Sequence, residues 1–282
     1  MGNQRLSRSY PPKKLLWMRE LLLIGICYAF YSWVRNQFGS ASVSAETAYK
    51  NAEYIIDLEE FFGLYFEPDL QSWFLDWEWF LRFWNIFYGT LHFGVTLGVL
   101  LFLYIRKPMD YPKWRTVGLL TTGVSLIGFA TFPLMPPRLL GNCRAVGACV
   151  ESPFLDTMAE YGGIWSFDSG LMESLSNQYA AMPSLHFAWA LWSYLAMKKH
   201  LKTNSMKFAM ALYPLLTIFA IMVTANHYWI DAVGGALVLL ISYWGGTRLQ
   251  SFTNQKTALF PLHKPESSHV LRFHSDLARF SR

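Results

Sequence analysis

Charge is scarce in this sequence of 282 residues: only 15% are Asp, Glu, Lys or Arg, whereas 53% are hydrophobic. Average chains have about 25% charged residues. The hydrophobic residues also fall into runs that approach the roughly 20 residues needed to cross a bilayer. A soluble globular protein would have to hide several such runs in one core. The composition therefore argues against a soluble protein and predicts an all-α membrane protein.

Cysteine is scarce too, because the chain has only three, too few for a disulfide framework. Cys27 lies within an apolar run, whereas Cys143 and Cys149 flank a short polar loop. The latter two pair if that loop faces an oxidising compartment, and two free thiols are the equal alternative. A net charge of +5 does not by itself indicate nucleic-acid binding, since the positions of the charges matter more. No nucleic-acid partner is expected.

Six apolar segments predict a six-transmembrane-helix bundle. They cover residues 15–34, 80–105, 116–134, 183–197, 208–225 and 228–244. The basic stretch ahead of the first segment also fits a signal peptide. The candidate cleavage site at 42–45 lies too far beyond the apolar run, so we expect this span to be retained. The predicted organisation is a basic N-terminus at 1–14, a six-span domain at 15–247 and a basic tail at 248–282.

Acidic residues concentrate after the first predicted span, where apolar residues recur at helical spacing between positions 45 and 66. This pattern predicts an amphipathic helix that lies along a membrane surface or over the bundle. We interpret its carboxylates as a solvated face; the less favoured alternative gives Glu59, Glu60 or Glu67 a ligand role. His92, inside the second span, is interpreted as a packed, hydrogen-bonded residue.

The distribution of Lys and Arg sets the predicted orientation. These residues gather in the N-terminal segment, the loops at 106–115 and 198–207, and the tail, whereas acids gather after the first and third spans. Cytoplasmic loops carry the excess of Lys and Arg, so both termini of this multi-pass cell-membrane protein are predicted to be cytoplasmic. The amphipathic helix is then extracytoplasmic. Five candidate site residues fall at extracytoplasmic helix ends: Arg138, Ser184, His186, His227 and Asp231.

Two short motifs carry the candidate chemistry. A Pro-Ser-x-His sequence at 183–186 is typical of a helix start, with the proline in the first turn. The free N–H groups of that turn, with Ser184 Oγ, form a cradle for a phosphate. His227 and Asp231 are four residues apart, so in a helix the carboxylate can lie beside the imidazole. Together the motifs suggest phosphoryl chemistry at a membrane surface.

Each of these side chains suits one role in such chemistry. Asp231 would hold the His227 imidazole in the tautomer that leaves one nitrogen lone pair available for attack. His186 would protonate the leaving oxygen. Arg138 would neutralise a phosphate oxygen, and Ser184 with the helix-start amides would hold the others. This scheme needs no metal and no cofactor. In the non-catalytic alternative, His186 and His227 are solvated residues at helix ends in the membrane–water interface, and Arg138 pairs with lipid headgroups.

The two motifs resemble the second and third signature motifs of the type 2 phosphatidic acid phosphatase superfamily. The sequence is most similar to its inositol phosphorylceramide synthase-like branch, which the Pro-Pro-Arg sequence at 136–138, the run at 178–186 and the six-span layout also fit. The resemblance covers residues 45–245. It implies that His227 takes the phosphate covalently, Asp231 orients it and His186 protonates the leaving group. The phosphate then passes to water or to a lipid alcohol.

The sequence departs from the phosphatase pattern where two cations would hold phosphate. Ala220 and Ile221 occupy the positions of a Ser-Arg pair, and residues 128–137 contain no Lys. A phosphomonoester is nearly a dianion at neutral pH, whereas a phosphodiester carries one charge, so fewer cations favour the diester. The sequence thus predicts a transferase that moves a phosphorylated headgroup, such as inositol phosphate, from a phospholipid donor to a lipid or glycan acceptor. The alternatives are a lipid phosphate or polyprenyl diphosphate phosphatase, and a non-catalytic transporter or scaffold.

Overall fold

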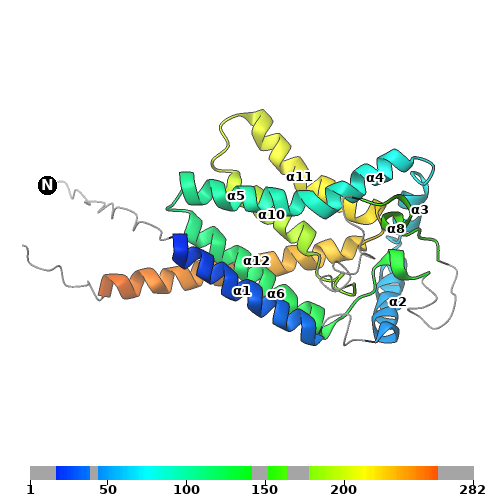
Figure 1. Ribbon diagram of the computed structural model, residues 1–282, viewed down its shortest axis with the longest axis horizontal. Coiled ribbons are helices and arrows are strands. Elements are labelled where there is room, and N and C mark those ends of the chain that lie inside the picture. The colour runs from blue at the N-terminus through cyan, green and yellow to red at the C-terminus, as the bar shows by residue number, and fades with distance from the viewer. Residues whose placement is uncertain (1–16, 39–43, 142–151, 164–177, 260–282) are drawn as a thin grey trace, which may run out of the picture. The chain divides into compact units, whose positions relative to one another are not determined.

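The computed structural model describes residues 17–38, 44–141, 152–163 and 178–259 (Figure 1). In these ranges the chain is helical, and its one β-type contact is an isolated bridge between Leu134 and Ala180. Residues up to Gly246 form one compact unit, and residues from Thr247 onward form a second. The elements are α1 (Trp17–Phe38), α2 (Ala45–Phe61), α3 (Glu67–Ser72), α4 (Glu78–Ile86), the π-helical turn η1 (Phe87–Leu91), α5 (His92–Arg106), α6 (Tyr111–Thr131), the 3-10 turn η2 (Pro137–Leu139), α8 (Thr157–Tyr161), α10 (Leu185–Met197), α11 (Asn204–Val223) and α12 (Trp229–Leu259).

Three helical segments in the described ranges are long and apolar enough to cross a membrane. They are Glu78–Arg106, which joins α4, η1 and α5, then Asn204–Val223, and Trp229–Ser251. The predicted all-α membrane class is therefore confirmed. α1 and α6 are long enough, at 22 and 21 residues, but less apolar. α10 has only 13 residues, about 20 Å of helix, so the six-span count stays a prediction.

Several helix boundaries differ from the predicted ones. Pro183 does not lie in the first turn of α10, because Ser184 is the N-cap and the helix begins at Leu185. α12 continues to Leu259 instead of ending at residue 244. Cys143, Cys149, the segment at 1–16 and the tail from residue 260 lie outside the described residues.

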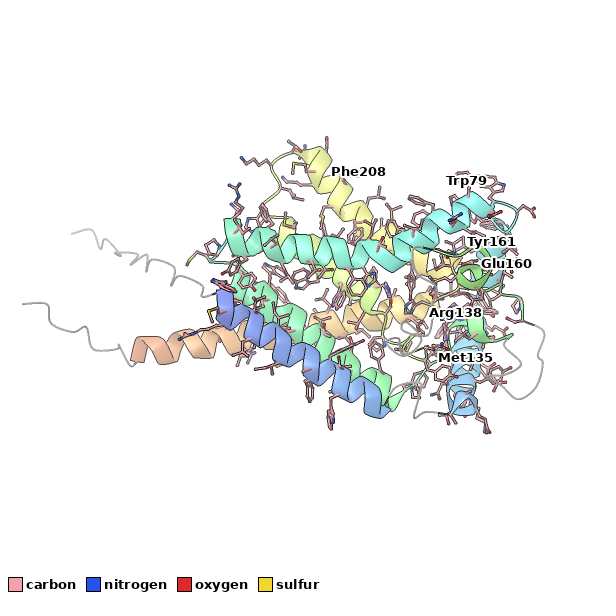
Figure 2. The ribbon with its side chains drawn as sticks, in the orientation of Figure 1. Trp79, Met135, Arg138, Glu160, Tyr161 and Phe208 are labelled. Atoms are coloured by element: carbon pink, nitrogen blue, oxygen red, sulfur yellow. The ribbon has the colours of Figure 1, made fainter. Side chains whose placement is uncertain are left out.

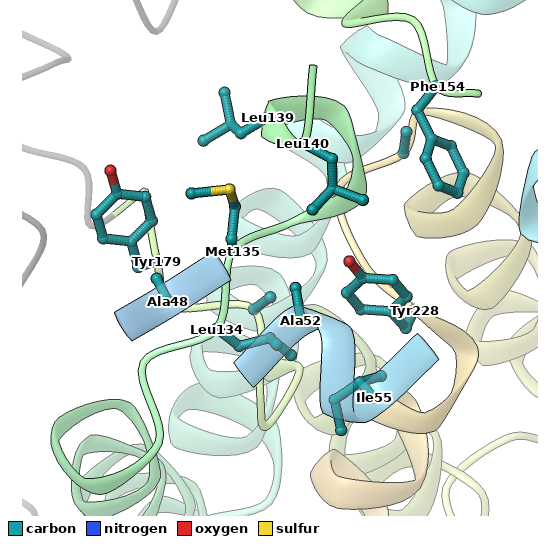
Figure 3. Packing of buried hydrophobic residues seen from close by; sticks show 12 residues of the cluster. Ala48, Ala52, Ile55, Leu134, Met135, Leu139, Leu140, Phe154, Tyr179 and Tyr228 are labelled. Atoms are coloured by element: carbon teal, nitrogen blue, oxygen red, sulfur yellow. The ribbon is translucent and has the colours of Figure 1, made fainter. Parts of the chain in front are cut away.

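The amphipathic helix α2 is present, and its buried face packs on the protein. Its Ala48, Ala52 and Ile55 are buried against the extended segment that leads from α6 to η2 (Figure 3). Asn51 Nδ2 donates to the Pro133 carbonyl oxygen at 2.8 Å, and the Met135 N–H donates to the Ala48 carbonyl oxygen at 3.1 Å. α2 thereby fixes the loop that carries Arg138.

The acids of this region are not all solvated. Glu59, at the end of the buried face of α2, and Glu67, the first residue of α3, are each fully buried, whereas Glu60 is exposed. The predicted solvated face is therefore wrong for Glu59 and Glu67. The reason is tertiary packing: both carboxyl groups contact the start of α12, as the hydrogen bonds below show.

Close packing of α12 against the start of α10 depends on glycine. A Cβ atom on Gly235 would overlap the carbonyl oxygen of Ser184, which is backbone and cannot move aside. On Gly234 it would make an ordinary contact, 3.4 Å from Pro183 Cβ. The absence of a side chain at Gly235 brings the first turns of the two helices together, and with them the two motifs singled out in the sequence.

Candidate active site

His227 and Asp231 are hydrogen-bonded and buried at the junction of α11 and α12. The His227 Nδ1 atom lies 3.1 Å from Asp231 Oδ2, which also accepts the Tyr228 N–H at 3.1 Å. A carboxylate can only accept, so Nδ1 carries the hydrogen and Nε2 keeps its lone pair. Asp231 is fully buried and His227 is 3% exposed. The pair is thus held in a fixed orientation, with Nε2 of His227 turned away from the carboxylate.

The His227–Asp231 contact was expected from two residues on one helix, and it arises in a different way. His227 precedes α12 and does not share a helix face with Asp231. Instead α11 ends at Val223, and Ala225 adopts a left-handed conformation with φ 52°. The N–H groups of Asn226 and His227 then both donate to the Ile221 carbonyl oxygen, at 3.0 and 3.1 Å. This tight turn brings the imidazole back over the first turn of α12.

His186 lies in the first turn of α10 with its ring between two aromatic neighbours from the η1–α5 junction. Its ring centroid is 4.1 Å from that of Tyr88 and 4.1 Å from that of His92, and it is 5.6 Å from that of His227. The two histidines from the two motifs therefore face one site.

His92 is a packed, hydrogen-bonded residue, as predicted, and it also contacts His186. Its Nδ1 atom lies 2.9 Å from the Tyr88 carbonyl oxygen, so Nδ1 donates and the ring orientation is fixed. Tyr88 lies within the π-helical turn η1, which ends just before His92, and such turns are frequent at functional sites. Sequence reasoning missed Tyr88, although a Tyr and a His four residues apart on an apolar helix were a usable signal.

Ser184 caps α10, and its own amide is already used. Its Oγ accepts the Phe187 N–H at 3.5 Å, and its N–H donates to the Asp231 carbonyl oxygen at 2.9 Å. The predicted cradle is therefore smaller than expected from the sequence. In the described part of the chain, the first-turn amides without a protein acceptor are those of Leu185 and His186. The Ser184–Asp231 bond also ties the two motifs together through their backbones.

Arg138 lies beside the turn that carries His227, at the same end as α2 (Figure 2). Its N–H donates to the Ala225 carbonyl oxygen at 2.8 Å, and its Nε donates to Asn226 Oδ1 at 3.0 Å. Nη1 forms an ion pair with Asp156 at 2.7 Å, and the Arg138 side chain is 8% exposed. The guanidinium is thus held rigidly beside the site, with its charge balanced by a carboxylate. Neither Asp156 nor Asn226 was singled out from the sequence.

A small cavity of about 10 Å³ adjoins His186, large enough for one water-sized group. Its lining is aromatic, apolar and hydroxylic, without Lys or Arg, and includes Ala220 and Ile221. The two positions that depart from the phosphatase pattern therefore face the site region and place no cation there. Within the described residues, no group of three or more His, Cys, Asp or Glu side chains is arranged to hold a metal ion.

The sequence is similar to known membrane proteins. Residues 53–245 match the family model of the PAP2 superfamily. The chain is 29% identical over 169 residues to the inositol phosphorylceramide synthase catalytic subunit aur1 of Schizosaccharomyces pombe. This match covers 55% of the chain and 37% of that protein, so the chain spans little more than a third of its relative's length. No solved structure gives a significant match.

Proposed function

Because the chain belongs to the PAP2 superfamily, we propose that it is an integral membrane phosphotransferase. It moves a phosphorylated headgroup, such as inositol phosphate, from a phospholipid to a hydroxyl group of a lipid or glycan. The observation that carries this proposal is the buried His227–Asp231 hydrogen bond with the His186 ring 5.6 Å away. The likeness to an inositol phosphorylceramide synthase subunit supports the choice of headgroup.

The proposed reaction has two displacements at phosphorus. In the first, His227 Nε2 attacks, the bond from phosphorus to the diacylglycerol oxygen breaks, and His186 gives that oxygen a proton. Asp231 stabilises the positive charge that develops on the His227 ring. In the second, His186 takes the proton of the acceptor hydroxyl, whose oxygen attacks phosphorus as the P–N bond breaks. The headgroup ends on the acceptor and both histidines return to their starting states.

The local charge favours a diester substrate over a monoester. Arg138 is the cation beside the His227 turn, and Asp156 already balances its charge at 2.7 Å. Such a site is suited to one negative charge rather than nearly two. Ala220 and Ile221 line the neighbouring cavity without adding a cation. A lipid phosphate phosphatase is therefore the less favoured alternative, and the assay below distinguishes it.

We also propose that the predicted six spans are retained, with both termini cytoplasmic and the active site on the extracytoplasmic face. One charge of α1 and one of α6 neutralise each other: Arg115 Nη1 lies 2.6 and 2.7 Å from the two Glu20 oxygens, and Tyr111 donates to Glu20 at 3.1 Å. Paired, mostly buried charges are the form that a membrane tolerates. Accessibility labelling of tags at both ends in intact cells tests this topology; labelling of either end without permeabilisation contradicts it.

The test of the function uses purified protein in vesicles of phospholipid labelled in its diacylglycerol part. A transferase releases labelled diacylglycerol only when a hydroxylated lipid acceptor is present. A panel of phospholipid headgroups then identifies the donor. Release of inorganic phosphate from a lipid phosphomonoester without any acceptor would instead identify a phosphatase, and no turnover of either substrate class would refute both enzymatic assignments.

A further inference from the structure

Two buried carboxyl groups hold the start of the helix that carries Asp231. Glu67 Oε1 accepts the Trp229 N–H at 2.8 Å, and Glu67 Oε2 accepts the Phe66 N–H at 3.1 Å. Glu59 Oε1 accepts the Ile230 N–H at 3.3 Å. Trp229 and Ile230 are the first two residues of α12, between His227 and Asp231. The pair thus caps the helix at the point where the candidate nucleophile and its acid partner meet.

The two carboxyl groups differ in what their oxygens do. Both oxygens of Glu67 accept backbone N–H groups, so its side chain acts as an acceptor throughout. Glu59 Oε2 is buried and has no hydrogen-bond partner in the described part of the chain, and the Glu67 carboxyl lies beside it. A proton on Glu59 Oε2 can be donated to Glu67, which removes both the unpaired oxygen and the repulsion between two charges.

The electrostatic surroundings support this assignment of the proton. Burial, then the neighbouring Glu67 charge, raises the pKa of Glu59 to about 9. Burial also raises the pKa of Glu67, while hydrogen bonds from the Trp229 N–H and other donors act in the opposite direction. Tyr65 between α2 and α3, Tyr228 before α12, and Asp231 within it also face the pair. None of these neighbours supplies a positive charge.

We propose that Glu59 and Glu67 are positioning residues for the transfer reaction: a carboxylic acid on Glu59 and a carboxylate on Glu67 together fix the first turn of α12, and so the contact between His227 and Asp231. This role rests on the proposed function of the site. One carboxylate at a helix N-terminus is favourable because it meets the positive end of the helix dipole. A second charge there, close to Asp231, would work against the pair.

The proposal predicts that the two residues respond differently to the same substitution. In Glu59→Gln the amide oxygen can accept the Ile230 N–H while its NH₂ group donates to Glu67, so the arrangement is kept. In Glu67→Gln one accepting oxygen becomes an NH₂ group that faces a backbone N–H, and the first turn of α12 shifts. We expect kcat close to wild type for Glu59→Gln and about 10- to 100-fold lower for Glu67→Gln, with KM little changed. Glu60→Gln, an exposed neighbour, is the matched control.

Two measurements need no substrate and so separate this proposal from the proposed function. The first is the rate at which diethyl pyrocarbonate acylates His227, read from the mass of its peptide; Glu67→Gln lowers it severalfold and Glu59→Gln leaves it unchanged. The second is thermal stability against pH. The raised pKa of Glu59 means that the folded protein binds more protons than the unfolded chain between about pH 4.5 and 9, so stability falls across that window. Glu59→Gln removes the part of this decline that Glu59 contributes.

The outcomes are distinct. If wild type turns over no phospholipid yet His227 acylation and the pH profile behave as described, the function is wrong and the positioning pair stands. Equal kcat values and equal acylation rates in Glu59→Gln and Glu67→Gln overturn the proposal, as does a stability decline that persists unchanged in Glu59→Gln.

Discussion

Replacing Asp231 by Asn removes one negative charge and leaves the shape of the site intact. The amide oxygen can take the place of Oδ2, where it accepts the His227 Nδ1–H and the Tyr228 N–H. The NH₂ group then takes the place of Oδ1, which has no hydrogen-bond partner in the described ranges. The change therefore isolates the charge that is proposed to stabilise the positively charged His227 ring during attack on phosphorus.

The size of the effect follows from the geometry. The ring nitrogen and the carboxylate oxygen are 3.1 Å apart, and opposite charges about 4 Å apart attract by about 4 kcal/mol at an effective dielectric constant of about 20. Each 1.36 kcal/mol corresponds to a tenfold change in rate. We therefore expect kcat of Asp231→Asn to fall about 10³-fold, with KM nearly unchanged because the charge acts mainly in the transition state.

The assay is diacylglycerol release from labelled phospholipid in vesicles, compared with Asp57→Asn, which makes the same substitution at an exposed position on α2. Thermal unfolding of both variants checks that the fold is kept. Turnover of Asp231→Asn within about threefold of wild type would show that the carboxylate charge does not assist the reaction, and the nucleophile assignment would lose its electrostatic basis.

Three further predictions follow from the same geometry. His186→Ala abolishes turnover of natural phospholipids but retains release from a p-nitrophenyl phosphodiester, whose leaving group needs no proton; equal loss on both donors contradicts the general-acid role. Gly235→Ala, whose Cβ would overlap the Ser184 carbonyl, lowers activity at least about tenfold, whereas Gly234→Ala does not; kinetics of the two side by side decide this. Activity survives extensive chelation of metal ions, and a strict requirement for an added divalent cation counts against the mechanism.

The sequence was sufficient to identify the two motifs, because each consists of residues that lie within five positions of one another. The spacing of His227 and Asp231 predicted their contact, and the Pro-Ser-x-His sequence predicted the helix start that carries His186. The predicted position of that start was wrong, because Ser184 is the N-cap and Pro183 lies outside the helix. The exact route was not predictable. The His227–Asp231 contact arises from a left-handed turn at Ala225 instead of a shared helix face, and single-sequence patterns do not show that conformation at an alanine.

The burial of Glu59 and Glu67 was the main failure of prediction, and it had a detectable cause. Ala48, Ala52 and Ile55 form the buried stripe of α2, and Glu59 continues that stripe at the next helical position. An acid in line with a buried face needs a partner, and the partner here is the backbone of a helix about 170 residues later in the chain. That pairing depends on tertiary packing. The same limit applies to Arg138, whose contacts with Asp156 and Asn226 no local pattern indicates.

The central claim is that His227 carries the phosphorus between donor and acceptor. It is tested most directly by incubating the protein with a donor labelled at phosphate, without acceptor, then quenching in alkali and mapping the label by mass spectrometry. We predict an acid-labile label on the His227 peptide that disappears when acceptor is added and never forms in His227→Ala. A label on another residue, or normal turnover by His227→Ala, would contradict the account.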